Sequence, residues 1–188
     1  MFERGFKTWC EQISLKLRKE LGLRGTDPLD PWKLAVHLGI KVKTTSEFAA
    51  LASSDRQILE SDSAWSAVTL EVAGRKCIIL KDSNSVGRKS SDLTHELAHQ
   101  LLGHKATGVG SSVGGHLMVH SFNQLEEEQA NWLSASLLLP RPALIHIKKR
   151  FKDDDIEAAK TYQVSVAMLK YRLGVTGVNY QMRRGSDR

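Results

Sequence analysis

The sequence has 188 residues, of which 41% are hydrophobic and 26% are charged, and these proportions fit one globular domain. They exclude disordered, collagen-like and coiled-coil classes. No apolar stretch approaches the roughly 20 residues that span a bilayer, and the N-terminus has no apolar secretory core, so we expect a cytoplasmic protein without a membrane partner. Cys10 and Cys77 are the only cysteines, which argues against a disulfide framework and against a cysteine-built zinc site.

The formal net charge of +6 lies entirely at one end of the chain. Residues 141–188 contain eleven Lys or Arg and five Asp or Glu, whereas the preceding residues are balanced. A basic end suits an acidic partner or a nucleic acid. It also suits a solvated surface that aids solubility. On charge alone, we favour this second interpretation.

The first predicted elements are two helices and a strand. Residues 2–22 form an amphipathic helix, because their apolar residues recur at steps of three and four. Asp30 can cap a short helix with Pro31 at its first position, running to about Leu38. Gly39 ends that helix, and residues 40–43 follow as a strand.

The middle of the chain predicts a β-hairpin followed by a helix. The strands are residues 64–72 and 76–80, around Ala73-Gly74-Arg75. The helix begins near Val86 or Ser91 and ends at Leu102, where Gly103 is a natural C-terminal cap. Residues 104–124 are glycine-rich, and we expect them to be irregular. A connection of this length in a compact domain usually serves a function or moves.

The remaining residues predict helices only. Residues 125–139 form a long helix that Pro140 ends, and three shorter helices follow at about 141–150, 154–161 and 165–173. Helices therefore outnumber strands, and the strands cluster before the middle helix. This order predicts an α+β fold, mostly helical, with a small sheet packed against the middle helix.

Residues 95–99 read His-Glu-Leu-Ala-His, and this motif indicates a metal site. Residues four apart share a helix face, so His95 and His99 can bind one ion. Glu96 lies about 100° around the helix and can reach a water beside the ion without being a ligand. A helix with two ordinary histidines is the structural alternative.

A catalytic zinc site needs a third protein ligand and one open position. A third His six residues after His99 would provide it, but Lys105 occupies that position. His104 is one residue short and follows the helix-ending Gly103, so we do not assign it as a ligand. The better source is the acidic cluster at 126–128, which lies at the start of the next helix and contains Glu127.

Asn131 shares a helix face with Glu127, four residues earlier. Glu127 can therefore be a ligand while Asn131 hydrogen-bonds the far nitrogen of a ligating His, which fixes the imidazole tautomer. The alternative is that the three glutamates only favour a helix N-terminus through its dipole. That alternative explains where the cluster lies but not the Asn.

Three motifs together resemble the ImmA/IrrE family of metallopeptidases. They are His-Glu-Leu-Ala-His, then Glu127 with Ala130-Asn131, and then Leu-Leu-Leu-Pro at 137–140. Less specific similarities outside these motifs extend the resemblance over about residues 28–175. Gln129 departs from the family, which often has Glu there, and Leu133-Ser134 stands where Phe-Ala is commoner.

The resemblance implies a zincin-like core with a gluzincin site. His95, His99 and Glu127 would be the ligands of one zinc ion, and Glu96 the general base. A site of two imidazoles and one carboxylate also accepts manganese or iron. We divide the chain into an N-terminal helix (1–27), a metallopeptidase core (28–140) and a basic helical segment (141–188).

Family members cleave a repressor encoded nearby, so the resemblance implies an endopeptidase whose protein substrate is a helix-turn-helix repressor. The reaction would need a hydrogen-bond donor for its oxyanion, and His116 and His120 are candidates. The alternative, which we favour for each, is a solvent-exposed histidine of the loop. If the strand at 76–80 is an edge of the sheet, an extended substrate could pair with it.

A second interpretation is a DNA- or repressor-binding module with little or no protease activity. Residues 156–173 resemble a helix-turn-helix, with Ser165 as the cap of the second helix and Lys170 and Arg172 on it. The structural alternative, which we favour, is that Val164, Met168 and Leu169 pack inward and complete the core.

Overall fold

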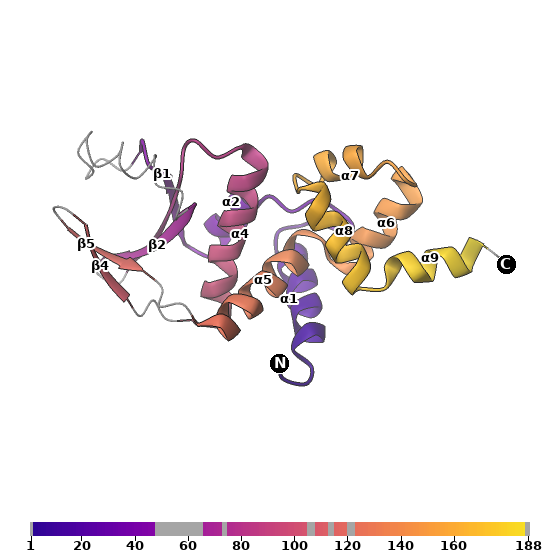
Figure 1. Ribbon diagram of the computed structural model, residues 1–188, viewed down its shortest axis with the longest axis horizontal. Helices are drawn as coiled ribbons and strands as arrows, with labels where there is room; N and C mark the ends of the chain where they lie inside the picture. The colour runs from indigo at the N-terminus through magenta and orange to yellow at the C-terminus, as the bar shows by residue number, and fades with distance from the viewer. Residues whose placement is uncertain are drawn as a thin grey trace. The chain divides into compact units, whose positions relative to one another are not determined.

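The computed structural model describes residues 2–47, 66–72, 75–104, 108–112, 115–119 and 123–186. Helices and strands follow one another as an α+β fold, as predicted (Figure 1). The chain divides into two compact units, one of Pro31–Ala130 and one of Met1–Asp30 with Asn131–Arg188. The division into 1–27, 28–140 and 141–188 stays a prediction.

The unit Pro31–Ala130 contains the strands and the histidine motif. Its elements are α2 (Pro31–His37), β1 (Lys41–Thr44), β2 (Ala67–Val72), β3 (Arg75–Leu80), α4 (Val86–Leu102), β4 (Gly108–Ser112), β5 (Gly115–Val119) and the start of α5 (Gln124–Leu138). The predicted hairpin strands are therefore present, while residues 64–65 and 73–74 lie outside the described part.

The three-stranded sheet has the order β1-β3-β2. β1 is parallel to β3 and β2 is antiparallel to it, so Ile78 faces Val42 on one side and Thr69 on the other. This strand is therefore not an edge, and the hypothesis that a substrate could pair with it is wrong. Its two neighbours already use its backbone N–H and C=O groups, which a substrate strand would need.

Helix α4 packs against β2 and β3 of this sheet (Figure 1). Ile78 and Leu80 of β3 are fully buried, as are Leu93 and Leu97 of α4. Burying each such side chain contributes about 1.5–3 kcal/mol relative to exposure. The apolar stripe of α4 is therefore used for packing, and the histidines lie on a different part of the helix surface.

Both ends of α4 have specific caps. The Ser85 hydroxyl accepts a hydrogen bond from the Arg88 N–H, at 3.3 Å, so the helix begins at Val86. Gly103 has φ of 72°, a left-handed conformation that suits glycine. The predicted C-terminal cap is at this residue.

Strands β4 and β5 form an antiparallel hairpin in which Val109 pairs with Met118 and Ser111 with His116. The prediction of an irregular segment is therefore wrong for residues 108–112 and 115–119. Glycine has a low strand propensity, but cross-strand backbone hydrogen bonds do not require side chains, and pairing outweighs the propensity here.

The other unit is helical. It contains α1 (Phe6–Glu20), the rest of α5, α6 (Arg141–Phe151), α7 (Asp155–Thr161), α8 (Val166–Val175) and α9 (Val178–Ser186). The sequence did not predict α9. Val178 is fully buried in the core of this unit, so packing stabilises a helix whose composition gives little local signal. No helix in the described residues is long and apolar enough to cross a membrane.

Two buried arginines tie this unit together. Arg18 is fully buried, and its guanidinium donates to the Ser14 hydroxyl at 2.7 Å and to the Leu138 carbonyl at 3.2 Å. Arg172 of α8 is also fully buried and donates to Glu11 at 2.5 Å and to the Leu139 carbonyl at 3.1 Å. These bonds satisfy helix-terminal carbonyls that would otherwise lack donors.

Candidate metal centre

Helix α4 supplies the two histidines of the motif. His99 is buried at 2% exposure, and the His95 side chain is 24% exposed. Their Nε2 atoms are 3.0 Å apart, and their rings meet edge to face with centroids 4.7 Å apart. The spacing of four residues therefore brings both imidazoles to one point on the helix surface.

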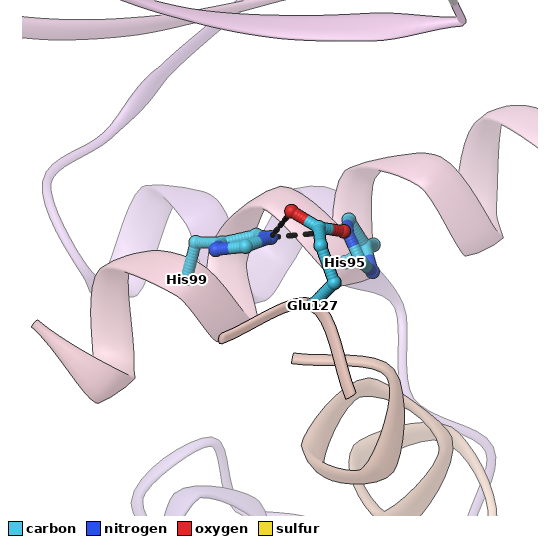
Figure 2. A group of neighbouring side chains, drawn as sticks. All are labelled: His95, His99 and Glu127. Atoms are coloured by element: carbon cyan, nitrogen blue, oxygen red, sulfur yellow. Dashed lines mark hydrogen bonds and ion pairs between the residues drawn. The ribbon is translucent and has the colours of Figure 1, made fainter. Parts of the chain in front are cut away.

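Glu127 joins the histidines from the first turn of α5, as Figure 2 shows. Its Oε2 is 3.2 Å from His95 Nε2, and its Oε1 is 3.4 Å from His99 Nε2. The three residues form a group whose ligand atoms all lie within 4.8 Å of one another. The residues that the sequence predicts as ligands are thus brought together by the fold.

The spacing of these atoms fits a small metal ion. Ligands at 2.0–2.1 Å in a tetrahedral site are about 3.3–3.4 Å from one another. The two Nε2 atoms here are 3.0 Å apart, and each of them is 3.2 or 3.4 Å from a different oxygen of the Glu127 carboxylate. Two imidazole nitrogens and one carboxylate are also donors that zinc accepts. Both the geometry and the chemistry of His95, His99 and Glu127 therefore fit a bound divalent cation.

Glu96 lies beside the group and is held by the sheet. It is 7% exposed, and its Oε2 accepts a hydrogen bond from the Thr69 hydroxyl of β2, which is itself buried at 3%. A buried carboxylate needs such a donor, because desolvation without a partner is costly. The bond ties Glu96 to the strand that packs against α4.

Asp92 lies one turn before His95 on α4. It accepts hydrogen bonds from Arg88, at 3.0 Å, and from Asn84, at 3.2 Å. Burial raises the pKa of Asp92 above its usual value, and the charges of Arg88 and His95 and the bond from Asn84 only partly oppose this. The histidine face of α4 therefore begins beside a partly buried acidic group.

His104 contacts His99 on the side away from Glu127. The two Nδ1 atoms are 2.9 Å apart, and the rings meet edge to face with centroids 5.0 Å apart. His104 Nε2 is 3.2 Å from Oε1 of Gln129 on α5. His104 is thus close to the group without belonging to the three residues whose ligand atoms converge.

The other predicted site residues are not joined to the group by the described contacts. Asn131 is exposed, and its backbone carbonyl accepts from the Ser134 hydroxyl at 3.1 Å. His116 lies in β5 opposite Ser111, and only its backbone is described. His120 lies outside the described residues. The orienting role of Asn131 and the oxyanion roles of the two histidines stay predictions.

The helix pair α7 and α8 has the caps expected of a helix-turn-helix. Ser165 caps α8 by accepting from the Met168 N–H at 3.1 Å, and Leu169 is fully buried. Lys170 is exposed, but Arg172 is buried and bound to Glu11, so it does not present a charge to a partner. DNA contact by these helices stays a prediction, but Arg172 is no longer a candidate contact residue.

Sequence reasoning did not assign a role to Thr69, and it considered His104 only as a ligand. A signal for His104 was present, because Gly103 as a helix cap places the next residue against the one five positions earlier, which is His99. Thr69 had a weaker signal, as a hydroxyl between the apolar residues Val68 and Leu70 in a sheet expected to pack against the motif helix.

An α+β fold whose motif helix and following helix bring two imidazoles and a carboxylate together is the arrangement of a protein with an HExxH motif whose residues could hold a metal ion. The family model of peptidase family M78, described as the IrrE N-terminal-like domain, matches residues 37–174, which is more than half of the chain. The chain therefore belongs to the ImmA/IrrE family, and this membership indicates a metallopeptidase-type function.

The fold also resembles a solved structure. A Mycobacterium tuberculosis transcriptional regulator aligns with a TM-score of 0.51 and 12% sequence identity, over 92% of this chain and 47% of the regulator. This chain thus spans about half the length of that protein, and at this identity the likeness concerns the fold alone. Comparison with curated proteins gives no significant match.

Proposed function

We propose that this protein is a zinc-dependent endopeptidase that cleaves a transcriptional repressor at a specific site. The observation that carries the proposal is the convergence of His95, His99 and Glu127, whose ligand atoms all lie within 4.8 Å of one another. Membership of a peptidase family supports the same reading. The two histidines and the glutamate would hold the ion, and a zinc ion there supplies Lewis-acid chemistry that favours attack of water on a peptide carbonyl.

Glu96 is the general base in this proposal. Its carboxylate accepts a proton from the attacking water as the new C–O bond forms, and it returns a proton to the leaving amine as the C–N bond breaks. The Thr69 hydroxyl binds one oxygen of this carboxylate and limits its rotation. Holding the base in one orientation reduces the entropy that must be lost before proton transfer.

The substrate class is inferred from the family, whose members act on repressors encoded nearby. The identity of the metal is also part of the proposal, because manganese and iron accept the same ligands.

The experiment compares the wild-type protein, loaded with zinc, with the Glu96→Gln variant. Each is incubated with purified helix-turn-helix repressors encoded beside its gene, and new N-termini are identified by mass spectrometry. We expect one or a few discrete new N-termini with the wild type and none with Glu96→Gln, although both bind zinc. Intact repressors, together with no cleavage of a native lysate by the zinc-loaded wild type, would contradict the proposal.

A further inference from the structure

His104 reaches His99 because of how α4 ends. The His104 N–H donates to the His99 carbonyl at 3.0 Å, and the Gly103 N–H donates to the Gln100 carbonyl at 3.2 Å. Together with the left-handed Gly103, these bonds form a Schellman motif, which brings the side chains of residues 99 and 104 together. An apolar contact usually occupies this place, whereas here two imidazoles are hydrogen-bonded.

A continuous hydrogen-bonded chain runs from His99 through His104 to Gln129. The Nδ1 atoms of the two histidines are 2.9 Å apart, and His104 Nε2 is 3.2 Å from Gln129 Oε1. Gln129 follows Glu127 by two residues on α5. These hydrogen bonds therefore connect Nδ1 of His99, the ring nitrogen away from the candidate metal site, to α5, the helix that carries Glu127.

The direction of the protons in this chain follows from the acceptor at its end. An amide oxygen only accepts, so Nε2 of His104 carries the proton of that bond. A neutral imidazole has a single N–H, so Nδ1 of His104 is an acceptor. Nδ1 of His99 must then be the donor, and Nε2 of His99 is left with the lone pair that a metal ion requires.

We propose that His104 and Gln129 are positioning residues that hold His99 in the Nδ1–H tautomer and fix its ring for metal binding. The inference rests on the proposed metal site. In the opposite proton order, His99 would carry its hydrogen on Nε2 and would have to move or lose it before binding a metal ion, which weakens binding. A histidine–glutamine pair thus does here what a carboxylate or a backbone carbonyl commonly does behind a ligating His.

The variants separate the hydrogen bond from packing. His104→Leu removes the acceptor but keeps an apolar contact suited to the Schellman motif. Gln129→Leu removes the terminal acceptor, and Gln129→Glu, the matched control, keeps a group that accepts from His104. Circular dichroism and thermal unfolding establish that each variant is folded.

Two measurements test the proposal. Zinc affinity is measured by competition with a chromophoric chelator at neutral pH, and the tautomer of His99 is read from proton–nitrogen correlation spectra of the metal-free protein. We expect zinc to bind His104→Leu about 10–100-fold more weakly than wild type. Gln129→Leu should also weaken binding, and Gln129→Glu should not. His99 in the wild type should carry its hydrogen on Nδ1.

The outcomes distinguish this inference from the proposed function. If the wild type binds zinc and a folded His104→Leu binds it equally well, the positioning role is overturned while the metal site stands. A hydrogen on Nε2 of His99 in the metal-free wild type would overturn the role as well. If the wild type binds no metal, the proposed function fails, and the tautomer measurement still tests the proton order.

Discussion

The hydrogen bond between Thr69 and Glu96 makes the most specific energetic prediction. Both side chains are buried, at 3% and 7% exposure, and the hydroxyl of one donates to a carboxylate oxygen of the other. A hydrogen bond to a charged group contributes about 1.5–3 kcal/mol to stability. We therefore expect a coupling free energy of that size between the two residues.

A double-mutant cycle measures this coupling. Thr69→Val replaces the hydroxyl by a methyl group of similar shape, and Glu96→Ala removes the acceptor. The free energies of unfolding in urea of wild type, both single variants and the double variant give the interaction energy directly. Thr69→Ser is the matched control, because it keeps the hydroxyl and should retain most of the coupling.

The coupling also has a functional consequence. Thr69 contacts none of the three candidate ligands in the described contacts, so Thr69→Val should bind zinc as the wild type does. Its peptidase rate should fall, because the base is no longer held in one orientation. A coupling near zero, or equal effects of Val and Ser, would refute the idea that the hydroxyl positions Glu96.

Two further predictions concern stability. Burial would raise the pKa of Asp82, but hydrogen bonds from Ser46 and Thr45 outweigh it and lower the pKa, so Asp82→Ala should cost about 1–2 kcal/mol in urea unfolding at pH 7. Because the pKa of Asp82 is lower in the folded protein, its stabilising contribution is complete above the pKa of the unfolded chain, near 4, and disappears as pH falls through the folded-state pKa. If wild type and Asp82→Ala still differ in stability by the same amount at pH 2–3, this prediction is contradicted. Removing the guanidinium of buried Arg172 as Arg172→Met should destabilise the protein by about 3 kcal/mol, because Oε1 of Glu11 and the Leu139 carbonyl lose this donor. An unchanged unfolding midpoint would show that the ion pair contributes nothing.

The candidate ligands could be predicted from the sequence because they depend on local geometry. His95 and His99 are four residues apart and so share a face on any α-helix, and Gly103 indicates where α4 ends. The start of α4 was left open between Val86 and Ser91, and the Ser85 cap decides it. Glu127 was harder, since it lies on another helix. Only the chemistry of a three-ligand site, together with the family resemblance, indicated it.

The errors arose where pairing between distant segments decided the outcome. That β3 is central depends on β1, more than 30 residues earlier in the chain, and no local pattern shows which of three strands lies in the middle. The β4–β5 hairpin forms despite glycines that argue against strands, and α9 depends on the burial of Val178. In each case tertiary contacts outweigh local propensity.

The His104 contact falls between these cases. Its cause is local, because Gly103 ends the helix in a left-handed turn, but its meaning depends on Gln129 from α5. Taken as a ligand, His104 was in the wrong register for a motif with a third His. The role of His104 beside His99 becomes evident only when its contacts with both His99 and Gln129 are known.

Metal content is the most direct test of the central claim. Purified wild type, His99→Ala, Glu127→Ala and, as a control outside the ligand set, Glu96→Gln are each dialysed with zinc, and bound metal is measured by mass spectrometry. We predict about one zinc per chain in wild type and in Glu96→Gln, and none in the two ligand variants. Wild-type protein without bound metal, or a full equivalent of zinc retained in both His99→Ala and Glu127→Ala, would contradict the account.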